Sequence, residues 1–226
     1  DPSPYTAHGV LMGIKASAKW QLGTESLKGM RIAVQGLGNV GSNLVRFLVE
    51  EGAQAIVSDI DQEKVKLYAD KYKISTSHPD EILFAPCDIL APCALGAVVN
   101  DKTIDRIQAK VIAGGANNQL AEARHGDMLK QKGILYAPDY VINAGGLMNV
   151  FVELEGYSQE RAHEKTKKVF DNCWKVFEIA KKENIGTHLA ADRLAEERIN
   201  TIGRLKQRHQ GKASRNFTTL KEVNNR

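Results

Sequence analysis

The chain has 226 residues, of which 42% are hydrophobic and 26% are charged, and its net charge is +4. This composition predicts a soluble globular protein of one large domain or one and a half, with enough apolar material for an α/β core. The mild charge does not indicate nucleic-acid binding, and no stretch approaches the roughly 18 apolar residues of a membrane span. We therefore expect neither a nucleic acid nor a membrane as a partner.

The cysteines and histidines lack metal-site spacing. Three cysteines, an odd number, predict reduced thiols rather than a disulfide framework, and they are Cys87, Cys93 and Cys173. The six histidines are scattered, so we predict no metal site. With no signal peptide pattern, we expect a cytoplasmic protein. Because the chain begins at Asp1 without a methionine, we expect a processed product or a piece of a longer protein.

The first predicted element is a helix that follows a non-helical entry segment. Two prolines in residues 1–6 favour extended backbone there. Apolar residues then recur at helical spacing from Val10 to Leu22, and Gly23 is a typical helix stop.

The run from Arg31 to Glu50 predicts a buried strand, a glycine-rich turn and a helix. Ile32–Val34 is a short apolar run, and apolar residues recur every four positions from Val40 to Leu48. Between them lies the pattern G-x-G-x-x-G, formed by Gly36, Gly38 and Gly41. In this context the first glycine permits a tight turn, the second lets a pyrophosphate approach the backbone, and the third lets the helix lie close to the strand. The amides and dipole of the helix start favour the phosphate charge.

A second predicted strand, Ala53–Ser58, ends at Asp59, about 20 residues after the glycines. A carboxylate there accepts hydrogen bonds from the adenosine ribose hydroxyls and repels a 2′-phosphate. The position therefore predicts NAD rather than NADP. A structural turn followed by a solvated aspartate is the alternative interpretation.

Helices and strands alternate after Asp59. The predicted helices are Gln62–Lys73, Asp101–Gln108 and Leu120–Lys132, and the apolar runs are Asp88–Ala91, Val111–Ala113 and Ile134–Ala137. This alternation predicts an α/β fold with a doubly wound parallel sheet, the NAD(P)-binding Rossmann fold, with helices at the C-terminus. Ligands of such sheets bind outside the carboxyl ends of the strands.

Two segments at these strand ends are rich in small residues and asparagine. Gly114–Leu120 reads GGANNQL, and Val141–Asn149 reads VINAGGLMN. The asparagine amide donates and accepts without charge, so it suits the nicotinamide carboxamide or a substrate carboxylate. Ordinary turn chemistry explains the composition equally well. Asp139 is a candidate site carboxylate, although capping explains it as well.

The C-terminal part reads as helices followed by a basic tail. We predict an amphipathic helix over Gln159–Lys182 capped by Ser158, and a last helix capped by Asp192. The tail from Lys206 is basic and polar. We expect residues 1–190 to form the dinucleotide-binding domain and residues 191–226 to form a separate helix and tail.

Six segments together resemble one family. They are DPSPYTAHGV, RIAVQGLGNVG, CDILAPCALGAVVND, KVIAGGANNQL, YAPDYVINAGG and AADRLAEERI. In this order, from Asp1 to about Ile202, they are similar to the Glu/Leu/Phe/Val amino-acid dehydrogenases, above all to those that act on branched-chain amino acids. The resemblance implies a homo-oligomer that uses NAD to deaminate L-leucine or another branched-chain L-amino acid oxidatively, giving the 2-oxo acid, ammonia and NADH.

The resemblance also implies the site residues. Those that would bind the cofactor are Thr6, Gly36, Leu37, Gly38, Asn39, Val40, Gly41, Asp59, Ile60, Cys93, Ala94, Ala113, Gly114, Ala116, Asn117, Asn118 and Asn143. Those that would bind the substrate are Asn118, Leu147 and Val150. Leu147 stands where the family often has the smaller valine, so the preferred substrate size stays open.

The family's catalytic lysines and aspartate belong to an N-terminal domain, and no motif in the chain matches them. Because this chemistry needs a general base, we expect the chain alone to bind NAD without turning over amino acids. We also expect residues 191–226 to return to that domain. The open alternatives are a valine, phenylalanine or glutamate dehydrogenase of the same family, a non-catalytic NAD-sensing regulatory domain, and a structural scaffold without NAD affinity.

Overall fold

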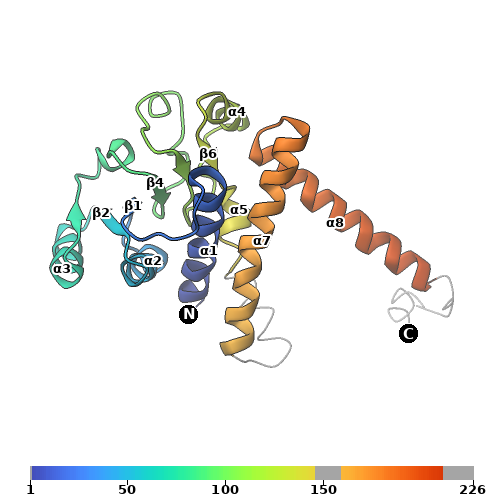
Figure 1. The fold of residues 1–226 in the computed structure, drawn as a ribbon, viewed down its shortest axis with the longest axis horizontal. Helices are drawn as coiled ribbons and strands as arrows, with labels where there is room; N and C mark the ends of the chain where they lie inside the picture. Colours follow the sequence, from blue (N-terminus) through green and yellow to red (C-terminus); the bar gives the residue numbers. More distant parts are fainter. Residues whose placement is uncertain (1, 146–158, 211–226) are drawn as a thin grey trace, which may run out of the picture. The chain divides into compact units, whose positions relative to one another are not determined.

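The computed structural model describes the backbone of residues 2–145 and 159–210 and the side chains of residues 2–145 and 166–200. The described residues form one six-stranded sheet, and every pairing is parallel, in the order β3-β2-β1-β4-β5-β6 (Figure 1). The strands are β1 (Arg31–Gln35), β2 (Gln54–Ser58), β3 (Ser75–Thr76), β4 (Ile89–Pro92), β5 (Val111–Ile112) and β6 (Leu135–Tyr136). The order runs outward from β1 in both directions, which confirms the predicted doubly wound α/β fold.

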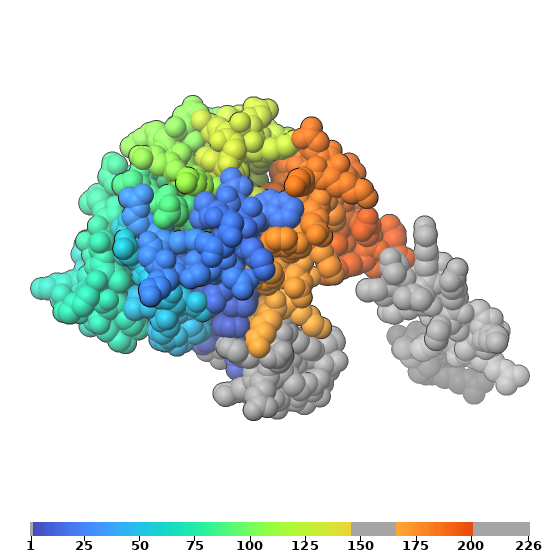
Figure 2. Space-filling model, viewed as in Figure 1, coloured from blue at the N-terminus to red at the C-terminus, as the bar shows by residue number. Residues whose placement is uncertain are grey.

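Three helices pack together on one side of the sheet. They are α1 (Ser3–Leu22), α2 (Asn39–Glu50) and α7 (Gln159–Glu183), and α1 contacts both of the others (Figure 1). Figure 2 shows the blue residues of α1 beside the orange residues of α7. The ring of Trp20 on α1 lies 5.0 Å from that of Trp174 and 5.7 Å from that of Phe177. Apolar burial therefore fixes α1 and α7 as one unit.

A second apolar cluster fills the opposite face. Alternate residues along a strand point to the same face, and the cluster takes Ala33, Leu90, Ile112 and Tyr136 from four neighbouring strands. Ile82 from η1 (Ile82–Phe84) and Leu129 from α4 (Ala123–Gln131) pack against them. Helix α3 (Gln62–Tyr72) contacts β2 and β3, and helix α5 (Asp139–Ile142) follows β6.

The register of the central strands aligns their carboxyl ends. Gln35, the last residue of β1, is opposite both Ser58 on β2 and Pro92 on β4. The segments that leave these three strands therefore begin at the same level of one edge. This is the edge where the sequence analysis expects a ligand.

The prediction for residues 1–6 is wrong, because α1 already begins at Ser3. Pro2 occupies the N-cap position, and its carbonyl accepts hydrogen bonds from the amides of Tyr5 and Thr6 (3.1 and 3.0 Å). Pro4 lies in the first turn, where an amide would have no partner within the helix, so proline costs nothing there.

The prediction of a helix over residues 101–108 is also wrong, because residues 101–106 form turns. Local side-chain hydrogen bonds compete with the helical ladder here. Asn100 Oδ1 accepts from the amide of Lys102 (2.9 Å), and the hydroxyl of Thr103 donates to the carbonyl of Val98 (2.6 Å).

The last helix, α8 (Thr187–Gln210), begins five residues before the predicted cap at Asp192. The hydroxyl of Thr187 donates to the carbonyl of Tyr136 (2.6 Å), and the amide of Ala190 donates to the carbonyl of Gly186 (3.1 Å). The helix α7 agrees with its prediction, whereas its predicted cap, Ser158, lies outside the described residues.

The chain divides into two compact units, residues 1–191 and 192–226, and the division falls within α8. Among the described residues, no helix has both the length and the apolar character needed to cross a membrane.

Candidate functional site

The glycine-rich turn joins β1 to α2. Gly36 has a φ of 95°, and a Cβ there would lie 2.7 Å from Cβ of Ala94. Its amide donates to the carbonyl of Ser58 on the neighbouring strand (2.7 Å). At Gly41 a Cβ would overlap the carbonyl oxygen of Gly36, so α2 lies directly against the end of β1. The turn therefore needs glycine at both positions.

Gly38 differs from these two glycines because nothing surrounds it. It is exposed at the N-cap of α2, and a Cβ would meet no atom within 4 Å. Its φ of −64° suits any residue. The fold itself gives no reason for a glycine here, and the backbone is left open to a ligand.

Asp59 lies next to this turn at the end of β2. Its carboxylate accepts hydrogen bonds from the amide of Leu37 (2.6 Å) and the amide of Asp61 (2.9 Å). Burial acts to raise the pKa of Asp59, but the backbone hydrogen bonds from Asp61 and Leu37 and the charge of Lys64 outweigh it, so the pKa lies below its ordinary value. The carboxylate is therefore ionised at neutral pH and is fixed to the glycine turn.

Two large apolar side chains are exposed on either side of the turn. Ile60 follows β2 and is 90% exposed, and Leu95 follows β4 and is 74% exposed. Since β2 and β4 flank β1 in the sheet, these side chains border the glycine turn. Exposed apolar groups beside an open backbone suit a flat ligand ring.

The loop after β5 lies against the same region. The amide of Ala116 donates to the carbonyl of Pro92 (2.9 Å), and a Cβ on Gly115 would lie 2.9 Å from Cγ1 of Val40. Asn117 and Asn118 are exposed on this loop, and Asn118 has a φ of 53°. The loop thus presents both asparagine side chains at the carboxyl edge.

The second asparagine-rich segment meets the first. Nδ2 of Asn143 donates to Oδ1 of Asn117 (2.6 Å). A Cβ on Gly145 would overlap the carbonyl oxygen of Tyr5, so the end of this segment lies against the first turn of α1. Thr6 is therefore brought beside it, with its hydroxyl donating to the carbonyl of Pro2 (3.2 Å).

Cys93 is a neutral thiol that lies between the start of α2 at Gly41 and the loop after β5 at Gly115. Burial raises its pKa to about 11, against a hydrogen bond from the backbone of Gly115. A thiol with this pKa is a poor nucleophile at neutral pH. All three cysteines are free, as predicted. In the part of the chain that the structure describes, no group of three or more metal-ligating side chains is placed to hold a metal.

The residues predicted to bind the cofactor all lie on segments at the carboxyl edge or on the first turn of α1. They are Thr6, Gly36, Leu37, Gly38, Asn39, Val40, Gly41, Asp59, Ile60, Cys93, Ala94, Ala113, Gly114, Ala116, Asn117, Asn118 and Asn143. Of these, Leu37 and Ala113 are fully buried. The predicted substrate residues Leu147 and Val150 lie outside the described residues.

Gln119 and Leu95 were not among the predicted site residues. Gln119 is 0% exposed, and its side chain is bonded within the loop that carries the asparagines. A glutamine at the end of a polar turn shows no periodicity that would predict burial. The signal for Leu95 was its place directly after a strand.

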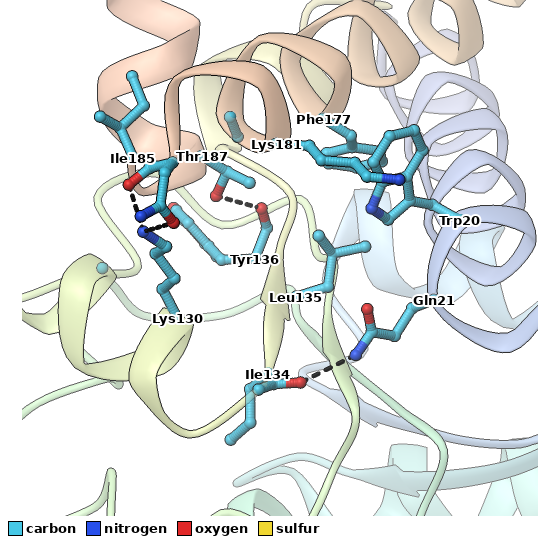
Figure 3. A pocket seen from close by; sticks show the side chains of 14 residues that line it. Trp20, Gln21, Lys130, Ile134, Leu135, Tyr136, Phe177, Lys181, Ile185 and Thr187 are labelled. Carbon is cyan, nitrogen blue, oxygen red and sulfur yellow. Dashed lines mark hydrogen bonds between the residues drawn. The ribbon is translucent and has the colours of Figure 1, made fainter.

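A cavity of about 320 Å³ lies elsewhere, beside the amino end of β6 (Figure 3). Trp20, Leu135, Tyr136 and Phe177 line it, together with two lysines. Lys130 donates to the backbone and side-chain oxygens of Asn184, and the ammonium of Lys181 lies 5.8 Å from the Trp20 ring. Both lysines belong to last helical turns, where a cation offsets the helix dipole. No predicted cofactor residue lines this cavity.

A doubly wound parallel sheet with a glycine turn at its central strand defines a class of α/β domains that bind nucleotides at this edge. Residues 3–63 and 56–206 match the model of the Glutamate/Leucine/Phenylalanine/Valine dehydrogenase family. The chain belongs to this family.

Relatives within the family act on different amino acids. The chain is 54% identical to leucine dehydrogenase of Geobacillus stearothermophilus over 202 residues, which are 89% of this chain and 55% of the relative. It is 48% identical to L-tryptophan dehydrogenase of Nostoc punctiforme over 92% of this chain and 59% of the relative. The crystal structure of L-tryptophan dehydrogenase from that organism matches with a TM-score of 0.87, covering 90% of this chain and 62% of that one. The chain thus spans somewhat more than half the length of these relatives.

Proposed function

We propose that the chain is the NAD-binding part of an amino-acid dehydrogenase that deaminates L-leucine or another branched-chain L-amino acid oxidatively. The products would be the 2-oxo acid, ammonia and NADH. The observation that carries the proposal is the pairing of an open glycine, Gly38, with the ionised carboxylate of Asp59, held 2.6 Å from the Leu37 amide of the same turn.

These residues fit a dinucleotide. The open backbone at Gly38 and the amides that begin α2 suit a pyrophosphate, and the exposed Ile60 and Leu95 suit the faces of an adenine ring. Asp59 would accept from the ribose hydroxyls, and its charge would repel a 2′-phosphate. The pKa below the ordinary value keeps that charge at neutral pH, which favours NAD over NADP.

The asparagines would orient the reacting ends of cofactor and substrate. When bound, NAD supplies the hydride acceptor for the α-carbon of the amino acid, and water then hydrolyses the imine. Asn143, fixed to Asn117 at 2.6 Å, would hold the nicotinamide carboxamide, and Asn118 would face the substrate. Ala113, which directly follows β5, would border the nicotinamide ribose.

Turnover would need a further domain. Residues 36–41, 59–61, 93–95, 114–118 and 141–145, which leave the strands at the carboxyl edge, contain no lysine, and the Cys93 thiol is neutral. We therefore expect the general base on a part that this chain does not contain, and residues 191–226 to return to that part. The 54% identity to leucine dehydrogenase supports a branched-chain substrate, and we expect a cytoplasmic homo-oligomer.

The test of dinucleotide binding is Gly38→Ala. Because a methyl group there meets no atom of the chain, the free energy of unfolding should change by less than about 0.5 kcal/mol. The affinity for NADH should fall by about tenfold or more, because the methyl group occupies the place of the pyrophosphate. Calorimetry and urea denaturation measure the two effects. Unchanged NADH affinity would contradict the proposal.

Two alternatives are separated by assays on the full-length protein. The relatives include tryptophan and phenylalanine dehydrogenases, so kcat/KM for leucine, valine, phenylalanine, tryptophan and glutamate decides the substrate. A regulatory NAD-sensing domain does not need the asparagine-rich loops. Loss of turnover in Asn118→Ala with NADH binding retained supports catalysis.

A further inference from the structure

Gln119 is a fully buried polar residue that directly follows the exposed pair Asn117 and Asn118 in the sequence. Its Nε2 donates to the carbonyls of Gly114 (2.8 Å) and Ala116 (3.0 Å). Both of these residues are buried. The side chain therefore bonds back to its own loop. It supplies the hydrogen-bond donors for the carbonyls of two buried residues. An unpaired buried carbonyl is costly, so the loop depends on this amide.

Asp139 joins this loop to the second asparagine-rich segment. It is buried, and its Oδ2 accepts from the amide of Gln119 (3.0 Å) while its Oδ1 accepts from the amide of Tyr140 (2.7 Å). Its carbonyl accepts from the amide of Asn143 (2.9 Å). Asp139 thus bonds to the backbone of both asparagine-rich segments, at Gln119 and at Asn143. The same two segments are joined by the side-chain bond between Asn143 and Asn117.

Gln119 also has an acceptor that stays unused. Its Oε1 is buried and has no hydrogen-bond partner. The two donated bonds fix which end of the amide is nitrogen, because a rotated amide would place its oxygen against two carbonyls. The two carbonyls of the loop therefore determine the orientation of the Gln119 amide. In this orientation its Oε1 has no hydrogen-bond partner.

We infer that Gln119 and Asp139 are positioning residues for the nicotinamide end of the dinucleotide. They act through Asn117, Asn118 and Asn143 and contact no ligand themselves. The inference rests on the proposed function. The inference distinguishes the two halves of the cofactor. In the described part of the chain, the glycine turn and Asp59, which would hold the ADP half, form no hydrogen bond with Gln119 or Asp139.

The experiment compares NADH with ADP-ribose as ligands of the 226-residue chain. Gln119→Met keeps the volume of the side chain and removes its donors. We expect NADH affinity to fall by about tenfold, which corresponds to the loss of about one hydrogen-bond contribution. ADP-ribose affinity should stay within about twofold. Gln108→Met is the matched control, since the exposed Gln108 also donates to one backbone carbonyl, that of Phe84 (3.1 Å).

Asp139→Asn is the second variant, in case Gln119→Met does not fold. Its amide nitrogen would face one of the two backbone amides, so NADH affinity should again fall while ADP-ribose affinity is kept. An equal fall in the affinities for NADH and for ADP-ribose would overturn the positioning role. Unchanged NADH affinity in a folded variant would also overturn it. A wild-type chain that binds neither NADH nor ADP-ribose would instead overturn the proposed function.

Discussion

At Gly41 the space of a missing side chain is occupied by a neighbouring backbone group, the carbonyl of Gly36. Alanine normally stabilises a helix relative to glycine by about 1 kcal/mol. Here Gly41→Ala should destabilise the fold by about 1–3 kcal/mol, because α2 must move away from β1 to make room. Urea denaturation measures the change, and a stabilised variant would contradict the close contact. The opposite expectation for Gly38→Ala makes the two glycines controls for each other.

Asp59 contributes stability that depends on pH. Its pKa in the folded chain lies below the ordinary value of 3.8. Its contribution is therefore complete above that value and is lost as the pH falls through the folded pKa. The difference in unfolding free energy between wild type and Asp59→Asn should be largest near pH 7 and should shrink below about pH 4. Denaturation curves from pH 7 to pH 3 test this, and a constant difference would count against the hydrogen bonds from Leu37 and Asp61.

At the scale of elements, α1 determines where α5 and its C-cap residue, Asn143, lie. Gly13 is in the middle of α1, and a Cβ there would overlap Cγ1 of Ile142 and would lie 2.5 Å from its Cδ1. Gly13→Ala should therefore destabilise the fold by about 1–3 kcal/mol despite the better helix propensity of alanine. Adding Ile142→Ala, which removes both Cγ1 and Cδ1, should recover part of the loss caused by the clash. A double-mutant cycle by urea denaturation measures the coupling, and strict additivity would show that the two residues do not meet.

Elements with strong periodicity were predictable from the sequence. Short segments in which local hydrogen bonds or prolines decide the structure were not. The strands β1, β2, β4, β5 and β6 and the helices α2, α3 and α7 follow from apolar spacing, and the turn follows from its glycines. The short exposed strand β3 has no apolar residue and was not predicted. The start of α1 depends on whether a proline falls at the N-cap or inside the helix. Residues 101–106 depend on whether Asn100 and Thr103 bond locally. Hydrophobic periodicity carries no information on either choice.

At the scale of the molecule, the parallel topology made the location of the site predictable, but not its internal bonding. Since carboxyl ends of parallel strands meet at one edge, segments as distant in sequence as Gly36 and Asn118 were assigned to one region. The bond between Asn143 and Asn117 and the burial of Gln119 depend on loop geometry, which spacing does not encode. Leu147 and Val150, which were predicted to bind the substrate, lie outside the described residues.

The last prediction concerns the proposal that this chain binds the cofactor and that a further domain supplies the general base. The described carboxyl edge carries a fixed carboxylate, neutral amides and a neutral thiol, and none of these groups is a base poised near neutral pH. The 226-residue chain should therefore bind NADH but form no NADH from NAD and L-leucine. The full-length protein should form it. A spectrophotometric assay at 340 nm on both proteins, with matched calorimetry of NADH binding, measures this directly. Leucine-dependent NADH formation by the chain alone would place a general base within it and would contradict the proposal that catalysis needs a second domain.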